Sequence, residues 1–380
     1  MNSKARPFLD FYEKHGIIPT NLNIDSQPEF FMQRDRLFAS LGVPPILLRG
    51  KNIFELGPGT GQKATHLLSM HPMSYVAIEN NPMSLKATQA VIESSKFSGN
   101  AEVKNQDFLT YESLTHFDLV LAELVLSTQS NPEKFLKKLL GITIDQGILV
   151  VTCCDPISML SETLRKAITF NENLIDGDLN SSAVRCANFF SQDLDHLNGM
   201  NRIRTDWAID QLIHPWIGPL LSIPDAIAHL GTAAVFHGSS PRFVDDYRWY
   251  KDPALSDSEL NKNAIHSYWE KCHNFLDSRL PRSTRDTNIN KSLYLICDEL
   301  YSVAYTNSWG KNSHPRVLEI CLKLKANISD LGEVVDKSLD AFINYWQSGD
   351  VASLQEFRPF WGRGTQYISF IKSCAPETSN

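Results

Sequence analysis

The spacing of apolar positions changes near residue 50. Before that point, apolar side chains such as Phe30, Leu37 and Phe38 recur at helical spacing, and Gly42 followed by two prolines is a typical helix end. We therefore predict an N-terminal helical segment over residues 1–50.

From residue 51, short apolar runs alternate with helical patterns. The predicted strands are NIFEL (52–56), SYVAIE (74–79), AEVKNQDF (101–108), FDLVLAEL (117–124) and GILVVTCC (147–154). Asn80 or Asn81, followed by Pro82, is a typical helix start. Strands that alternate with helices favour a parallel sheet covered on both faces, and the last two runs are continuously hydrophobic, as such a sheet requires. This predicts an α/β core over residues 51–155.

The remaining sequence is mainly helical, with two late strands. Helical patterns include DWAIDQLIHPWIGPLL (206–221), while TAAVFHGSSPRF (232–243) and GTQYISFIK (364–372) have strand character. We interpret the chain as a single sheet whose last strands are separated by two helical insertions. The predicted segments after the core are an insertion (156–230), a late strand and loop (231–250), a second insertion (251–355), and a final strand and tail (356–380).

Composition narrows the possible partners. The chain has 380 residues, and 36 Lys and Arg against 43 Asp and Glu give a net charge of −7, which disfavours a nucleic-acid partner. No apolar run approaches the roughly 20 residues that span a bilayer, and the N-terminus lacks a signal-peptide core, so we expect a cytoplasmic protein without a membrane partner. The seven cysteines include no C-x-x-C pair, and we predict no metal site.

The most informative motif is the glycine cluster after the first predicted strand, ELGPGTG. Gly57 and Gly59 would let the backbone approach a ligand, and Gly61 would let the next helix pack near the strand. The motif lacks the Gly-Lys-Ser/Thr of a P-loop, and its third glycine comes one place early for a dinucleotide fingerprint. Glu55 would repel a pyrophosphate and attract a cationic amino-acid group.

Two further acidic positions follow the next strands. Glu79, with Asn80 beside it, ends the second strand 22 residues beyond Gly57, where a carboxylate can accept hydrogen bonds from both hydroxyls of a ribose. Asp107 and Phe108 end the third strand, where a polar acceptor and an aromatic face could bind an adenine. The competing interpretations are a turn residue for Asp107 and a solvated charge at a helix start for Glu79.

The segments ELGPGTG, VAIEN, QDF and FDLVLAE together resemble the successive motifs of class I S-adenosylmethionine-dependent methyltransferases, over about residues 50–155. The resemblance implies an α/β fold with a Rossmann-like seven-stranded methyltransferase sheet, and S-adenosylmethionine as cofactor. The residues that it assigns are Glu55, Gly57 and Gly59 for the methionine moiety, Glu79 for the ribose, and Asp107 and Phe108 for the adenine. Gly61 and Asn80 complete our predicted cofactor set.

The acceptor side is less defined. The family pattern places Glu123, in AELV, at the reaction centre, and this segment lacks the Asn/Asp-Pro-Pro-aromatic sequence of base amino-methyltransferases. His237 follows a late strand, and Asp206, Asp210 and His214 have the spacing of one helix face that could present a base to a hydroxyl. A solvated helix face with a structural histidine is the competing interpretation of that stripe.

We therefore predict a methyltransferase that acts on a small or medium-sized polar metabolite, sugar-containing ones among the options, enclosed by the two insertions. Glu123, His237 and Asp206 are the predicted catalytic residues. The alternatives are an enzyme like the protein arginine methyltransferases, which the segment AELVLSTQSNPE partly resembles, a dehydrogenase that binds NAD, and a non-catalytic module that binds S-adenosylmethionine. The sequence leaves the methylated atom and the oligomeric state open.

Overall fold

A computed structural model describes residues 7–18, 21–22, 24–96, 100–197, 199–214, 220–245, 249, 251–252, 255–305, 309–310 and 313–374. Parts of the predicted segments 1–50, 206–221, 231–250 and 356–380 lie outside the described residues. The chain forms two compact units. Unit 1 comprises residues 1–153, 218–267 and 366–380, and unit 2 comprises residues 154–217 and 268–365.

Unit 1 contains a seven-stranded sheet with the strand order β3-β2-β1-β4-β5-β7-β6. The strands are β1 (Asn52–Leu56), β2 (Ser74–Ile78), β3 (Ala101–Lys104), β4 (Phe117–Ala122), β5 (Thr143–Cys153), β6 (Ala234–Ser240) and β7 (Gln366–Lys372). The neighbours among β1 to β5 pair in parallel, and β7 is antiparallel to both β5 and β6. The predicted Rossmann-like α/β sheet is confirmed.

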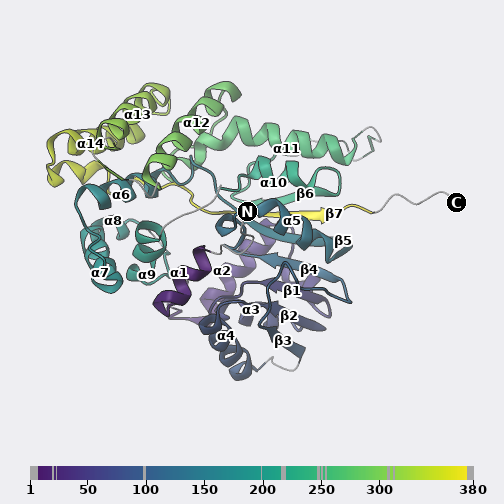
Figure 1. The fold of residues 1–380 in the computed structure, drawn as a ribbon. Coiled ribbons are helices and arrows are strands. Elements are labelled where there is room, and N and C mark those ends of the chain that lie inside the picture. The colour runs from purple at the N-terminus through teal and green to yellow at the C-terminus, as the bar shows by residue number, and fades with distance from the viewer. Residues whose placement is uncertain are drawn as a thin grey trace. The chain divides into compact units, whose positions relative to one another are not determined.

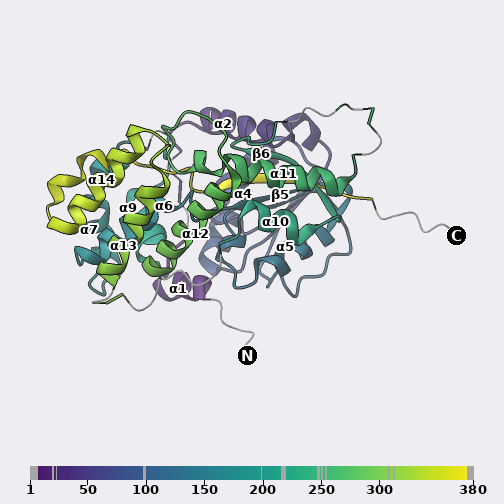
Figure 2. The same cartoon turned by 90° about the horizontal axis from the view of Figure 1, so that it is seen from above.

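Helices cover both faces of this sheet. Those of unit 1 are α1 (Pro7–His15), α2 (Gln27–Ser40), η1 (Pro45–Leu48), α3 (Gln62–Ser69), α4 (Pro82–Ser94), η3 (Leu126–Thr128), α5 (Pro132–Gly141), α10 (Ile223–Leu230) and the start of α11 (Asp257–Lys271). Figure 2 shows the strands β5 and β6 between α2 on one side and α5 and α10 on the other. The Asn81 side chain accepts hydrogen bonds from the backbone N–H groups of Met83 and Ser84, which confirms a predicted helix start.

Alternate strand positions build the core on the face that α2 and α3 cover. Ile53, Tyr75 and Leu119 point to this face, where they pack with Phe38 of α2 and Leu67 of α3. All five side chains are buried. On the opposite face, the Phe54 ring packs in an aromatic cluster with Phe108, Tyr111 and Phe117. Because β1 is covered on both sides, its carboxyl end and the glycine loop that follows are held rigidly between two packed layers.

Unit 2 has only helices as secondary-structure elements in its described residues, and loops join them. Its elements are α6 (Leu160–Asn171), α7 (Leu179–Phe189), α8 (Ser191–Leu194), α9 (Arg204–Ala208), the π-helix η4 (Ile209–Ile213), η5 (Cys272–Phe275), α12 (Thr287–Ala304), α13 (Ser313–Asn327), α14 (Glu333–Ser348) and η6 (Val351–Glu356). Figure 1 shows α12, α13 and α14 as successive helices. The helical character predicted for the insertions 156–230 and 251–355 is present in their described residues.

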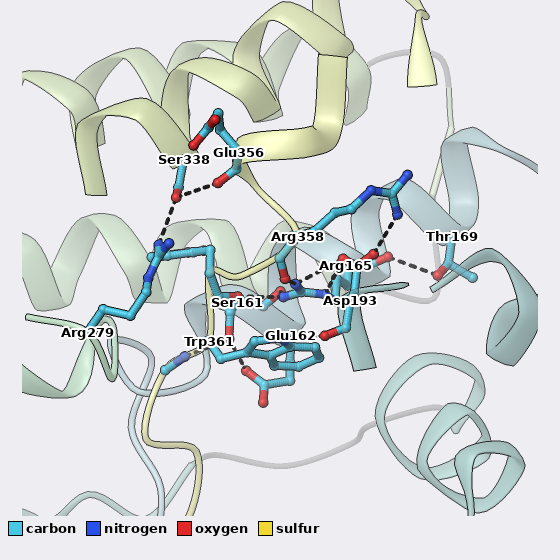
Figure 3. A network of polar contacts seen from close by, with 12 residues as sticks. Ser161, Glu162, Arg165, Thr169, Asp193, Arg279, Ser338, Glu356, Arg358 and Trp361 are labelled. Atoms are coloured by element: carbon cyan, nitrogen blue, oxygen red, sulfur yellow. Dashed lines mark hydrogen bonds and ion pairs between the residues drawn. The ribbon is translucent and has the colours of Figure 1, made fainter. Parts of the chain in front are cut away.

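A buried ion network anchors unit 2 (Figure 3). The Arg165 side chain has no exposed surface, and its guanidinium lies 3.6 Å from the centre of the Trp361 ring. It binds Asp193 at 3.0 Å and donates to the main-chain carbonyls of Arg358 and Phe360. Asp193 also accepts from the Arg358 side chain at 3.0 Å. The guanidinium therefore connects α6 to α8 and to the residues that follow η6.

Several absences hold for the described part of the chain. No helix there is long and apolar enough to cross a membrane. No group of three or more His, Cys, Asp or Glu side chains within the same ranges is placed to hold a metal ion. The cysteine thiols are free, with Cys374 exposed and the others buried.

Candidate cofactor site

The glycine loop joins β1 to α3. Gly57, Gly59 and Gly61 have φ angles of 68°, 65° and 75°, in the left-handed region that favours glycine. A Cβ on Gly61 would lie 2.8 Å from the Cα atom of Thr88, so α3 can begin beside α4 only with glycine there. The close neighbour is thus a helix, not the strand that we predicted. A Cβ on Gly59 would meet nothing within 4 Å, so the loop is open on that side.

Glu79 holds this loop from the end of β2. Its Oε2 accepts from the Gly59 N–H at 3.1 Å, and its Oε1 accepts from the Asn81 N–H at 2.9 Å. Burial raises the pKa of the Glu79 carboxyl, and the backbone N–H donors oppose the increase. Each carboxylate oxygen keeps a lone pair that could accept a hydrogen bond from a hydroxyl group, as the predicted ribose contact requires. Asn80, beside it, is partly exposed.

The predicted adenine contacts have other partners. Asp107 is exposed, and its Oδ1 accepts from the Leu109 N–H at 2.8 Å, which makes it a turn residue. Phe108 is only 3% exposed, and its ring packs 5.8 Å from that of Phe54 and 5.9 Å from that of Phe135. These contacts support the competing turn interpretation of Asp107 and place the Phe108 ring in the aromatic core.

Two buried carboxylates lie on the α2 and α3 side of the sheet. Glu55, on β1, is 2% exposed and accepts from the Tyr75 hydroxyl at 2.5 Å. Glu123 follows β4 and is 6% exposed. Both guanidinium NH2 groups of Arg34 donate to its carboxylate, one of them at 3.0 Å, and Lys63 Nζ donates at 2.9 Å.

Their surroundings drive the two pKa values apart. Burial raises the pKa of Glu55 to about 7, and the negative charge of Glu123 adds to the increase. Burial also acts to raise the pKa of Glu123, but the charges of Arg34 and Lys63 overcome it and hold that pKa well below its usual range. Glu123 is therefore ionised at neutral pH, whereas Glu55 titrates near neutrality.

This pairing corrects the catalytic role that we predicted for Glu123. The prediction required an exposed carboxylate that can accept a proton from the acceptor. The structure instead shows a buried carboxylate that two cations hold ionised, which makes it a weak base.

His237 lies elsewhere in unit 1. It is exposed on β6, and its Nε2 lies 3.3 Å from the carbonyl oxygen of Gly42. Together with Arg242 and Trp249, it lines a groove of about 1030 Å³. Because β6 is three strands from β4, His237 is about 14 Å from the strand that carries Glu123. These two predicted catalytic residues do not share a site.

Asp206 belongs to unit 2, near the end of α9. The predicted stripe of Asp206, Asp210 and His214 is wrong as a single α-helical face, because the α-helix ends at Ala208 and a π-helix follows. Asp210 forms an ion pair with Arg202 at 2.8 Å.

The sequence analysis missed the cations of the site. Arg34 and Lys63 bind Glu123, and the Tyr367 hydroxyl of β7 donates to the same carboxylate at 3.3 Å. A signal was present, since Phe30, Arg34 and Phe38 recur every four residues along the buried face of α2. A cation within an apolar stripe indicates a buried ion pair.

The residues around the loop fit S-adenosylmethionine, which carries a carboxylate, an ammonium group, ribose hydroxyls and an adenine. Glu55 and Glu79 can accept from the ammonium and the hydroxyls. Within the described part of the chain, the buried atoms Arg34 Nε, Asn81 Nδ2 and Ser84 Oγ have no hydrogen-bond partner. Buried polar atoms of this kind normally have a partner, which a polar ligand would supply.

Comparison with known proteins identifies a methyltransferase domain around the glycine loop. A family model described as a methyltransferase domain matches residues 47–202. A search of curated proteins gives no match.

Similar solved structures include the N-methyltransferase NodS from Bradyrhizobium japonicum WM9 in complex with S-adenosyl-L-homocysteine, with 16% identity, a TM-score of 0.31, and coverage of 39% of this chain and 74% of that chain. The CcbJ methyltransferase from Streptomyces caelestis has 16% identity and a TM-score of 0.29, with 34% of this chain and 51% of that chain covered. The [4+2]-cyclase SpnF has 12% identity and a TM-score of 0.40, with 97% and 93% covered.

The matched range contains the strands β1 to β5 and the glycine loop, and ends within unit 2. Residues 47–202 of this chain therefore form a methyltransferase domain.

Proposed function

We propose that this enzyme methylates a small or medium-sized polar metabolite, with sugar-containing compounds among the candidates. The observation that carries the proposal is the path of the chain. It first leaves unit 1 after Cys153, at the carboxyl end of β5, and makes its last return at Gln366, which pairs with Cys153 at the start of β7. Open α/β sheets bind their ligands at this edge. Two of the four connections between the units, those after Cys153 and before Gln366, therefore start from the edge that carries the glycine loop.

The composition of unit 2 supports a small acceptor over a protein substrate. Its described residues form helices and no strand, so they do not provide the β-barrel expected for an enzyme like the protein arginine methyltransferases. Helical segments that enclose a small molecule shield it from water and orient it. Good orientation of the reactants can lower the reaction barrier by about 7–11 kcal/mol.

Each group of this chain has a distinct task in the proposal. Glu79 and the Gly57–Gly61 loop bind the ribose and the methionine end of the cofactor, and Glu55 accepts from its ammonium group. The bound cofactor supplies an electrophilic methyl group on its sulfonium. Asp206 is our remaining candidate for a group that accepts a proton from the acceptor, and an Asp206→Asn variant with lowered kcat and unchanged cofactor affinity would support it.

Calorimetry with S-adenosylmethionine, S-adenosylhomocysteine and NAD tests the cofactor site. We expect the first two to bind and Glu79→Ala to weaken binding by about 1–3 kcal/mol, because charge-assisted hydrogen bonds are lost. Lack of binding by the wild type, or a preference for NAD, would overturn the cofactor assignment.

A metabolite library screened for release of S-adenosylhomocysteine tests the acceptor. Turnover with a polar metabolite supports the proposal. Turnover with histone-like peptides alone would instead favour the arginine-methyltransferase alternative. Cofactor binding without turnover on any library member or cell-extract fraction would favour a non-catalytic module.

A further inference from the structure

The turn that follows β4 presses on the glycine loop. A Cβ on Gly57 would lie 2.7 Å from Cγ2 of Val125, so the Val125 side chain packs directly against the loop. Leu124, one residue earlier, has a φ angle of 60°, in the left-handed region that branched and bulky residues rarely adopt. Such a conformation persists only where the surroundings enforce it, and it often marks a functional site.

Two contacts enforce this conformation. The Leu124 N–H donates to Oγ1 of Thr152 on β5 at 2.7 Å. On the other side of the turn, the Glu123 carboxylate is bound by both NH2 groups of Arg34 and by Lys63. Arg34 belongs to α2, which precedes the matched methyltransferase range of residues 47–202.

The segment that carries Arg34 also contacts the start of α3. Gln62 is the first residue after the glycine loop, and its side chain exchanges two hydrogen bonds with the backbone of Leu22, at 2.9 and 2.8 Å. One turn further along α3, His66 Nε2 lies 2.8 Å from Oδ1 of Asp35. Leu22 and α2 therefore contact both sides of the loop, at the β4 turn and at α3.

We propose that Arg34 is a positioning residue for the cofactor site. By holding Glu123, it fixes the left-handed turn at Leu124, and that turn sets the place of Gly57 through Val125. Helix α2 is then part of the cofactor site, although it lies outside the methyltransferase range. This inference rests on the binding of S-adenosylmethionine at the glycine loop.

A series at position 34 separates geometry from charge. Arg34→Lys keeps the positive charge but loses the bidentate hydrogen bonding to the Glu123 carboxylate, whereas Arg34→Met loses both. We expect both variants to bind S-adenosylhomocysteine more weakly, by about 10- to 100-fold for Arg34→Met, since small misplacements of a binding group have effects of that size. Lys51→Met is the matched control, because Lys51 pairs with Asp118 at the opposite ends of the same two strands, at 3.1 Å. Its affinity should equal that of the wild type.

The pH profile of affinity provides a readout that loss of stability alone would not change. The groups that face Glu55 are Tyr75 from β2, Glu123 from the β4 turn, Arg34 from α2 and Lys63 from α3. The positive charge of Arg34 lowers the pKa of Glu55, and binding of the cofactor's ammonium group strengthens as Glu55 ionises. Arg34→Met should therefore move the midpoint of the profile to higher pH, while Arg34→Lys leaves it near that of the wild type.

A suppressor tests the route through the turn. Glycine adopts a φ of 60° without strain, so Leu124→Gly combined with Arg34→Met should recover part of the lost affinity. Binding is measured below the unfolding temperature of every variant. If the wild type binds and Arg34→Met binds equally well with the same midpoint, Arg34 is not a positioning residue. If the wild type does not bind, the cofactor assignment itself fails.

Discussion

Alanine substitutions at Gly59 and Gly61 should separate binding from folding within a single loop. Both glycines have a φ in the left-handed region, where an alanine costs about 1–2 kcal/mol. They differ in what a new Cβ would meet. At Gly61 it would lie 2.8 Å from the Cα of Thr88, a main-chain atom of α4, whereas at Gly59 it would meet nothing within 4 Å.

The structure gives the magnitude of the difference. The Cβ of Gly61→Ala must move by about 0.6 Å to reach the 3.4 Å of ordinary contact, and α3 or α4 has to move with it. Crowding of this kind costs about 1–3 kcal/mol, so Gly61→Ala should lose about 2–5 kcal/mol in total. Gly59→Ala should lose only the backbone term. A unit of this size shifts its Tm by about 2–4 °C per kcal/mol.

The affinity for S-adenosylhomocysteine should follow the opposite order. The Cβ of Gly59→Ala enters the open space in front of the loop, so we expect at least a 10-fold loss of affinity with a small change in Tm, by calorimetry and differential scanning. Equal Tm values for the two variants would contradict the packing argument at Gly61. Affinity of Gly59→Ala equal to that of the wild type would show that the open side of the loop is not the cofactor side.

Three further predictions concern single side chains. Folding raises the pKa of Glu55 from 4.5 to about 7, so the folded state binds more protons than the unfolded state between these pH values. The free energy of unfolding should therefore fall by about 3 kcal/mol as the pH rises from 4.5 to about 7. Glu55→Gln should remove this contribution to the slope, while that of Glu79, whose pKa is also raised, remains; an unchanged slope would contradict the assignment to Glu55. Asn261→Ala should lower the free energy of unfolding by about 2–4 kcal/mol, because the Asn261 side chain accepts from the Phe236 N–H and donates to two carbonyls at the edge of the sheet. A loss below about 0.5 kcal/mol in thermal unfolding would refute this prediction. Arg165→Met should destabilise unit 2 by about 3–5 kcal/mol, since Asp193 would lose a buried partner, and a Tm like that of the wild type would contradict it.

Much of unit 1 was predictable because its signals are local. The strands of a covered parallel sheet are short, continuous apolar runs, and β1, β2 and β4 lie within the runs that we identified. The glycine loop and the Asn81 helix start depend on residues that are adjacent in sequence. The third predicted strand was too long, since β3 ends at Lys104 and Asp107 begins a turn.

The site was less predictable because its contacts are distant in sequence. Arg34 and Glu123 are 89 positions apart in the sequence, and no local pattern at either residue predicts that the other is its partner. The stripe at Asp206 failed for a different reason. Its spacing assumed 3.6 residues per turn, and the π-helix from Ile209 to Ile213 changes that period. Burial and pairing, not residue type, decided the role of each acid.

Glu55 and Glu123 illustrate this dependence most clearly. Both are glutamates, both are buried, and both lie at the carboxyl ends of adjacent parallel strands. Glu123 has two cationic partners and stays ionised, whereas Glu55 has a neutral hydroxyl partner and the charge of Glu123 nearby, so its pKa rises to about 7. One carboxylate thus stabilises the turn after β4, and the other can change its charge at neutral pH beside the glycine loop. An ammonium group that binds at Glu55 would favour the ionised carboxylate, so cofactor binding should release protons when it occurs below pH 7, and this release should vanish in Glu55→Gln.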